Sequence, residues 1–317
     1  MATVTLKQIA IAANTSIRTV NRALKGQQGI GEAKRKEILE LASKMGYTPN
    51  IAARNLRLQR SNFVGVIGYK NIDGVFSRRL NDLVQRLEAA GFYPILGMPP
   101  ENVEDCRKML LEWSGFVKHV VLFQSLSEEL RNELSSLPQH FISIDYESIS
   151  DGTSLTIDRS SGVKDGILHL VKSGCKKIFW CGKLASREEG LRKALDELSD
   201  AERPEYGHIQ AGINFDDGYA IGSDLIASGV DAAFFDTDRM ALGFLKYSWR
   251  HNIKVPEQIK VIGFDNDTAG QQSCPALSTV AHPIDEMNNK IVELVENAHL
   301  EAQSFEFKTS FISRESA

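Results

Sequence analysis

Several features that are common in other proteins are scarce or missing in this chain of 317 residues, and each absence narrows the possibilities. There are four cysteines, none in a Cys-x-x-Cys pair or beside a histidine at metal-ligand spacing, so we expect buried thiols in a reducing compartment rather than disulfides or zinc. These thiols belong to Cys106, Cys175, Cys181 and Cys274. No run of about 18 apolar residues occurs, and the N-terminus lacks the features of a signal peptide. We therefore expect a cytoplasmic protein without a membrane span.

The motifs of common enzyme classes are also missing. The chain has no phosphate loop of the Walker type, no Gly-x-Ser-x-Gly elbow and no Gly-x-Gly-x-x-Gly, and its seven histidines are dispersed. The carboxylate pairs Asp236/Asp238 and Asp265/Asp267 have the chemistry to hold a hard cation, but their predicted positions at strand ends favour a ligand crevice. We expect no enzyme, no catalytic residues, no cofactor and no metal.

Charge is divided unevenly along the chain. The first 61 residues hold 11 Lys plus Arg against 3 Asp plus Glu, a balance of +8, whereas the rest holds 26 against 38, a balance of −12. The net charge of −4 therefore conceals a cationic head and an acidic body. Such a head suits the capture of a phosphate backbone, although a merely solvated basic face has the same composition.

The N-terminal segment from Val4 to Gly26 has the signals of two short helices around a tight turn. Thr5 with Gln8 three residues later forms a capping-box pattern that starts the first helix. Asn14 can adopt the left-handed conformation of a helix exit, and Ser16 can cap the second helix. A third amphipathic helix is predicted from Glu32 to Met45 and ends at Gly46. A linker or hinge follows, opening at Pro49 and Asn50.

The second helix has a polar, basic outer face. Its apolar stripe leaves Ile17, Arg18, Asn21 and Arg22 outside, where they can reach a major groove. An ordinary helical hairpin gives the same local pattern, and the cationic head is what favours DNA. A helix-turn-helix DNA-binding element is the resulting prediction.

After Ser61 the sequence alternates between short apolar runs and amphipathic helices. This alternation is typical of parallel sheets covered by crossover helices, and it occurs in two similar α/β halves. Because loops at the carboxyl ends of the strands carry ligands in such folds, we expect a crevice between the halves. The predicted strands are 63–69, 93–98, 120–123, 141–144, 177–181, 232–236 and 260–264, and the predicted helices are 78–90 and 103–113 with others near residues 161, 187, 217 and 239.

Five motifs together resemble the lactose/galactose repressor (LacI/GalR) family from end to end. They are Val-Thr-Leu-x-x-Ile-Ala, Ser-x-x-Thr-Val-x-Arg-x-Leu, Gly-Tyr-x-Pro-Asn, Ala-Arg-x-Leu and a closing Phe-Ile-Ser-Arg-Glu-Ser. The resemblance implies a three-helix DNA-binding headpiece over residues 1–49, a hinge helix or linker over 50–61, and an effector-binding and dimerisation domain over 62–317. That domain resembles periplasmic sugar-binding proteins, with approximate bounds of 62–157 and 284–304 for one doubly wound subdomain and of 158–283 and 305–317 for the other.

The resemblance also assigns DNA-binding roles. Arg18 is the candidate for reading a guanine, with a phosphate contact as its alternative role, and Ile17 can offer apolar contact to a thymine methyl. Leu56 would wedge into the minor groove from a hinge helix that orders on DNA, unless it is an ordinary linker residue. The full set of DNA-binding candidates is Thr5, Ser16, Ile17, Arg18, Thr19, Asn21, Arg22, Asn50, Ala53 and Leu56.

Polar residues at the predicted strand ends become effector-binding candidates in the same way. Arg187 and Asp265 match the effector-binding arginine and aspartate of the family, and the aromatic residues suit an apolar sugar face. The complete set is Phe76, Asp145, Arg187, Phe215, Thr237 and Asp265. The loop from Gly182 to Arg187 is shorter than the family usually carries, and Val117-Lys-His-Val replaces a common Val-Asp-Gly-Ile. Two alternatives to the usual effector therefore stay open, an atypical ligand or no ligand.

The resemblance implies a homodimeric transcriptional regulator, a repressor, that binds a near-palindromic operator in double-stranded DNA. A small-molecule effector in the crevice, a sugar or a related polyol or nucleoside, would control it. The alternative is a solute-binding or sensor protein with the same body and no operator function. The two differ in the cationic headpiece, which only the regulator needs.

Overall fold

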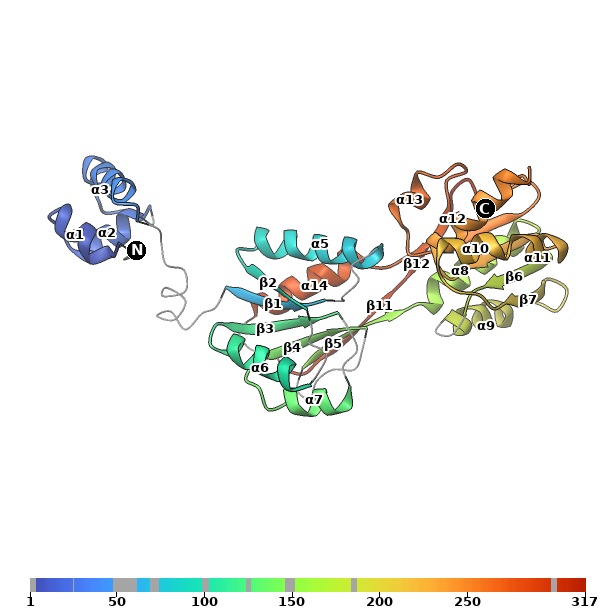
Figure 1. The fold of residues 1–317 in the computed structure, drawn as a ribbon, viewed down its shortest axis with the longest axis horizontal. Coiled ribbons are helices and arrows are strands. Elements are labelled where there is room, and N and C mark those ends of the chain that lie inside the picture. The colour runs from blue at the N-terminus through green and yellow to red at the C-terminus, as the bar shows by residue number, and fades with distance from the viewer. Residues whose placement is uncertain are drawn as a thin grey trace. The chain divides into compact units, whose positions relative to one another are not determined.

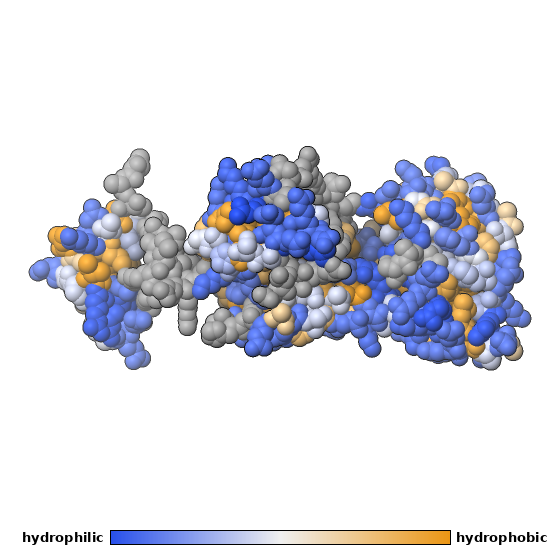
Figure 2. Space-filling view, turned by 90° about the horizontal axis from the view of Figure 1, so that it is seen from below, coloured by the Kyte–Doolittle hydropathy of each residue, from blue (hydrophilic) through white to orange (hydrophobic). Residues whose placement is uncertain are grey.

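The computed structural model describes residues 4–24, 26–47, 62–68, 74–98, 103–123, 127–145, 152–183, 187–297 and 301–317. The chain divides into two compact units, Met1–Arg60 and Ser61–Ala317, here called the headpiece and the body (Figure 1). In the view of Figure 2, hydrophilic residues cover much of the visible surface of both units, with hydrophobic residues in separate patches. No helix within the described ranges is long and apolar enough to cross a membrane.

The headpiece contains α1 (Leu6–Ala12), α2 (Ile17–Leu24) and α3 (Glu32–Lys44). The capping box at α1 is confirmed, since the Gln8 amide donates to Thr5 Oγ1 over 3.4 Å and the Thr5 amide donates to Gln8 Oε1 over 2.8 Å. Asn14 has φ of +44°, and Ser16 Oγ accepts from the Thr19 amide over 3.1 Å, as the sequence predicts. Ile9, Val20 and Ile38, one from each helix, are fully buried together. The three helices thus enclose a small core of their own.

The first sheet of the body consists of β1 (Phe63–Ile67), β2 (Tyr93–Gly97), β3 (Val117–Leu122), β4 (His140–Ile144), β5 (Thr153–Asp158) and β11 (Ser304–Lys308). Their order is β11-β5-β4-β3-β1-β2, and every pairing is parallel. The core on one face includes residues of α5 (Val75–Ala89) and α14 (Ile284–Glu296), and the core on the other face includes residues of α6 (Val103–Ser114) and α7 (Glu128–Leu134).

The second sheet consists of β6 (Lys177–Cys181), β7 (Glu205–Ile209), β8 (Ala232–Phe235), β9 (Lys260–Phe264), β10 (Ser278–Ala281) and β12 (Ser310–Ile312), in the order β12-β10-β9-β8-β6-β7. Only β12 runs antiparallel to its neighbour. One face packs on α8 (Ser160–Lys172) and α9 (Glu188–Glu197). The other packs on α11 (Gly222–Ala227) and α12 (Asp238–Arg250), near α10 (Phe215–Ala220) and α13 (Thr268–Gln271).

The predicted α/β class with two doubly wound sheets is confirmed, with one correction to a boundary. The segment from Phe305 to Lys308 lies in β11 and pairs with β5 of the first sheet. The last crossover between the sheets therefore follows Lys308, whereas the sequence led us to place residues 305–317 in the second half. A boundary of this kind depends on which strand the segment pairs with, and its local pattern does not contain that information.

A second correction concerns the cysteines. Cys106, Cys175 and Cys181 are buried free thiols, as expected, but Cys274 is exposed. Burial raises the pKa of the Cys106 and Cys175 thiols above their ordinary values. These two buried thiols are correspondingly inert.

Two glycines bring α10 and α12 into backbone contact. A Cβ atom at Gly218 would lie 1.9 Å from the carbonyl oxygen of Met240, and one at Gly243 would lie 1.9 Å from that of Phe215. Only glycine permits this approach, because any larger residue would force the helices apart. The contact holds the start of α10, and the loop before it, close to the carboxyl end of β8.

Candidate functional site

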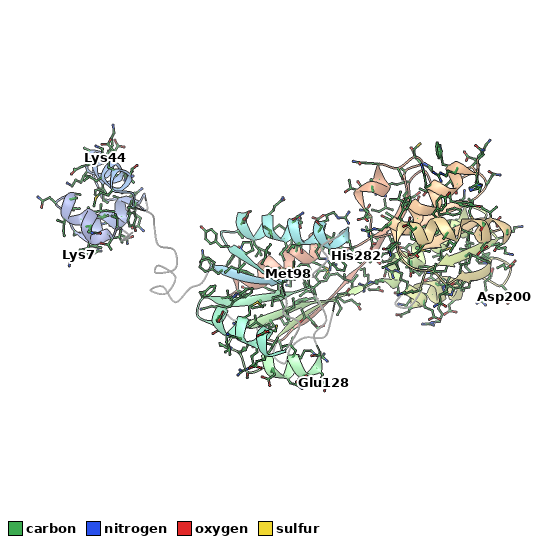
Figure 3. All side chains as sticks on the ribbon, in the orientation of Figure 1. Lys7, Lys44, Met98, Glu128, Asp200 and His282 are labelled. Atoms are coloured by element: carbon green, nitrogen blue, oxygen red, sulfur yellow. The ribbon has the colours of Figure 1, made fainter. Side chains whose placement is uncertain are left out.

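The exposed surface of α2 in the headpiece is where DNA reading was predicted. Ile17 is 46% exposed, and Arg18 beside it is also exposed. Ser16 Oγ and Thr19 Oγ1 lie 2.9 Å apart, so these hydroxyls pair at the start of the helix. Exposed Lys7 on α1 and Lys44 on α3 add positive charge elsewhere on the headpiece (Figure 3). The first turn of α2 thus offers an apolar side chain and a guanidinium side by side.

Arg22 is in different surroundings from Arg18. Its side chain is half-buried, and its Nη2 donates to the carbonyl oxygen of Gln28 over 2.7 Å. Gly29 has φ of +91°, and a Cβ there would lie 2.8 Å from Arg22 Nη2. Arg35 Nη2 also donates to this loop, to the carbonyl oxygen of Gln27 over 2.5 Å. Arg22 therefore braces the loop after α2, although the sequence places it on the outward face.

The remaining DNA-binding candidates fall into two groups. The hydroxyl of Thr5 is occupied in the capping box of α1, and Asn21 is half-buried. Asn50, Ala53 and Leu56 lie outside the described residues, so the hinge stays a prediction from sequence.

In the body, the carboxyl ends of the strands surround a cavity of about 340 Å³. Five of the six effector candidates line it, namely Phe76, Asp145, Arg187, Thr237 and Asp265. Phe215 does not line it; the first residue of α10, it is 39% exposed. The loop before α10 reaches the cavity with Ile213 and Asn214 instead, and that geometry depends on the helix contact at Gly218.

Sequence reasoning missed several charged residues of the cavity wall. They are Arg79 on α5, Arg159 after β5, Arg239 on α12 and His282 after β10, whereas Asp267 after β9 lines the cavity as the sequence predicts. Figure 3 shows His282 at the junction of the two sheets. Arg159 and His282 follow strands that were not predicted, which is why the rule about strand ends did not find them.

An ion pair crosses part of the wall. Both terminal nitrogens of Arg159 donate to the carboxylate of Asp145, with Nη1 to Oδ1 at 3.0 Å and a second bond between Nη2 and Oδ2. Asp145 has φ of +67°, a left-handed conformation that few non-glycine residues adopt. A bidentate pair of this kind fixes the orientation of both side chains.

Arg187 lies deep in the wall, with 17% of its side chain exposed. Its guanidinium carbon is 4.2 Å from the centre of the Phe264 ring, and its Nη1 is 4.0 Å from Asp236 Oδ1. Burial lowers the pKa of Arg187 and the Arg159 guanidinium adds to that effect, while the carboxylates of Asp236 and Asp265 oppose it. Within the described residues, its Nε atom has no hydrogen-bond partner.

Asp265 joins the two halves of the body. Its Oδ1 is 3.2 Å from Nε2 of His282, and its carbonyl oxygen accepts from Arg78 of α5 over 2.8 Å. Burial lowers the pKa of His282 below its ordinary value, although Asp265 works in the opposite direction, so the imidazole is neutral at neutral pH. Asp265 has φ of +112°, a conformation that this network holds in place.

Two aspartates stand behind the cavity and support it. Asp236 accepts from the indole of Trp180 over 2.8 Å and from the amide of Lys183 over 2.5 Å. Asp238 accepts from Thr279 Oγ1 and from the amide of Asp267, both over 2.6 Å, and burial raises its pKa to about 8. In the described part of the chain, no three His, Cys, Asp or Glu side chains lie close enough to hold a metal ion.

Comparison with known proteins assigns the two units. Residues 5–50 match the model for bacterial regulatory proteins of the lacI family, and residues 167–316 match the model for a periplasmic binding protein-like domain. The chain thus carries a LacI-family DNA-binding domain followed by a periplasmic-binding-like domain. A chain with these two domains is a DNA-binding transcriptional regulator with an effector-binding body, and the solute-binding alternative without operator function is not favoured.

Relatives of this chain align over most or nearly all of its length. The NTD biosynthesis operon regulator NtdR of Bacillus subtilis is 27% identical, with 98% of this chain and 99% of that protein covered. Catabolite control protein A of Priestia megaterium is 29% identical, covering 89% of this chain and 88% of that one. Among solved structures, the lac repressor dimer bound to operator and the anti-inducer ONPF has a TM-score of 0.78, 19% identity and 99% coverage of both chains. These relatives are regulators, not enzymes.

Proposed function

We propose that this regulator is a cytoplasmic homodimeric repressor that binds a near-palindromic operator and is controlled by a small polar effector in the cavity of the body. The main support for an effector is the cavity. It lies where parallel strands of both sheets end, the usual place for a ligand in such folds, and arginine, aspartate and aromatic side chains line it. Two solved structures of similar regulators contain ribose and cellobiose.

The two sheets give the effector a means of control. Arg78 of α5 donates to the carbonyl oxygen of Asp265 after β9, so the halves of the body touch beside the cavity. An effector that contacts both halves changes how they close, provided that it binds one closure more tightly than the other. The change reaches the DNA through the segment 50–61, for which Asn50, Ala53 and Leu56 remain the proposed contacts.

Dimerisation has support at one edge of the first sheet. Tyr93, Leu96 and Met98, in and after the edge strand β2, are about half exposed, at 47%, 58% and 56% (Figure 3 labels Met98), and Leu111 on α6 and Phe116 before β3 are also exposed apolar residues. An exposed apolar patch beside an open edge strand is a surface that a second copy would cover. A dimer would place two α2 helices on the two halves of an operator.

One experiment tests the operator and the effector together. Operator sequences are selected from random DNA with the full chain, footprinted, and then used to screen small polyols, nucleosides and their derivatives for compounds that change binding. We expect a near-palindromic footprint and at least one compound that shifts operator affinity. Failure to select any sequence over bulk DNA would contradict the operator part, and a single unpaired half-site would contradict the dimer.

A further inference from the structure

The charge of the cavity wall identifies the kind of effector more closely than the fold does. Four arginines line the cavity, Arg79, Arg159, Arg187 and Arg239, whereas only three carboxylates do, and the body as a whole is acidic. Burial is the main cause that lowers the pKa of both Arg187 and His282; Arg159 adds to the shift of Arg187, and Arg79 and Arg159 add to that of His282, so these arginines act on the same part of the wall. An excess of positive charge in one cavity of an otherwise acidic domain favours a negatively charged ligand.

Two of the three carboxylates of the wall, those of Asp145 and Asp265, already pair with other side chains. Both oxygens of Asp145 accept from Arg159, and Oδ1 of Asp265 is paired with His282. Neutral sugars are recognised in large part by carboxylates that accept from their hydroxyl groups, and here those three oxygens already face protein groups, the Arg159 guanidinium and the His282 imidazole. The available capacity of the wall is on the donor side.

Arg187 supplies that donor capacity. Its guanidinium is buried and stacked on Phe264, its Nε has no hydrogen-bond partner among the described residues, and its Nη1 is 4.0 Å from a carboxylate oxygen, Oδ1 of Asp236. That carboxylate, on Asp236, already accepts from Trp180 and Lys183. A buried donor that lacks an acceptor, as the Nε of Arg187 does among the described residues, is unfavourable until an acceptor binds, and the planar guanidinium matches a carboxylate or a phosphate.

We infer that the effector carries an oxyanion, a carboxylate or a phosphate group, that binds Arg187 within this arginine cluster. The inference rests on the proposed function, since it names the chemical class of the effector in the same cavity. The volume of about 340 Å³ limits the effector to a small molecule such as a single sugar unit. Phe76 and Ile213 provide apolar contact for the remainder of the ligand.

Matched pairs of probes test this inference on the full chain. Gluconate, glucuronate and glucose phosphate are each compared with glucose, and inorganic phosphate is tested alone, by calorimetry and by thermal shift at millimolar concentration. We expect at least one charged probe to bind at least about tenfold more tightly than glucose, because hydrogen bonds to charged groups are the stronger ones. Binding of glucose phosphate but not of the two acids identifies a phosphate ligand, and the reverse identifies a carboxylate.

Variants of Arg187 test whether this side chain binds the anionic group of the probe. Arg187→Met is expected to weaken binding of the charged probe by at least about tenfold, and Arg187→Lys, which keeps the charge and loses the planar fork, by less. Arg192→Met on α9 removes the same charge from an exposed side chain 3.3 Å from Asp196, and it should leave binding unchanged. Retained binding in a folded Arg187→Met protein would overturn the assignment.

Two further outcomes separate this inference from the function on which it rests. If glucose binds as tightly as its charged counterparts, the effector is neutral; the inference is then wrong, and the effector-controlled regulator stands. If no probe binds at millimolar concentration, the inference is again wrong. The operator screen described above then decides effector control independently, because it includes neutral compounds and measures DNA binding.

Discussion

The headpiece and the body place their arginines in opposite surroundings. In the headpiece, which carries a balance of +8, Arg18 is exposed at the start of α2 and shares the surface with other cations. In the body, which carries −12, Arg187 and Arg79 are withdrawn from solvent and gathered around one cavity. Exposed cations suit a polyanion such as duplex DNA, and enclosed cations suit a small anion, so the surroundings of each guanidinium indicate its ligand.

Salt is expected to give the largest separation between the two regions. A headpiece that neutralises several phosphates releases condensed counterions, so operator affinity should fall by about a thousandfold or more between about 50 mM and 200 mM salt. The enclosed cavity is screened much less, and affinity for a charged effector should change by less than about tenfold over the same range. Parallel titrations by fluorescence anisotropy and calorimetry measure both slopes. If operator affinity and effector affinity depend equally on salt, the proposed difference between exposed arginines that bind DNA and enclosed arginines that bind a small anion is wrong.

The buried carboxyl of Asp238 predicts a pH dependence that belongs to the body. Burial raises its pKa to about 8 from an ordinary value of 3.8, so between these values the folded chain holds a proton that the unfolded chain releases. The free energy of unfolding therefore falls as the pH rises through this window, by at most about 1.4 kcal/mol per pH unit for one proton. Urea denaturation at about pH 5 and about pH 7 measures the difference.

Asp238→Asn is the matched control for that measurement. The amide keeps the shape and can still pair with Thr279 and with the amide of Asp267, but it has no proton to release. Its unfolding free energy should depend less on pH than that of the unchanged protein. An unchanged pH dependence in the variant would mean that another group is responsible.

Arg18→Ala tests specificity in the headpiece. A guanidinium that donates two hydrogen bonds to a guanine contributes about 1 to 3 kcal/mol of discrimination, so preference should relax at one base pair of each half-site. Selection from a randomised operator library measures this directly. Lys44→Ala removes an exposed cation of α3 and should weaken all sequences alike. A uniform loss with Arg18→Ala as well would assign Arg18 to the phosphate backbone.

The parts of the molecule that the sequence predicts are those with a local cause. The caps at Thr5 and Ser16 and the turn at Asn14 depend on neighbouring residues, and all three are found. Asp145 and Asp265 were found because each directly follows an apolar strand, and the ends of parallel strands meet at one edge.

The residues that escaped prediction depend on tertiary contacts. Arg79 lies on an amphipathic helix, where a charged residue is expected to face solvent, yet it is 3% exposed and lines the cavity. His282 follows the strand Ser278–Ala281, whose small and polar residues lack the apolar pattern of a buried strand. The partner strand of β11 is likewise set by three-dimensional pairing.

Arg22→Met is expected to have the smallest effect of these substitutions. It tests whether Arg22 acts as an exposed DNA-reading arginine or as a half-buried arginine that stabilises the loop after α2. The change removes the hydrogen bond to Gln28 that braces the loop after α2, which should lower local stability by about 1 kcal/mol. Hydrogen exchange at the amides of residues 27–29 in the full chain measures the loosening, and operator affinity should fall a few-fold for all sequences. Arg18→Ala is the contrast, because it should change preference without affecting this exchange. If Arg22→Met instead weakens the preference for one operator base pair and leaves the amide protection of residues 27–29 unchanged, Arg22 reads a base, as the sequence pattern indicates.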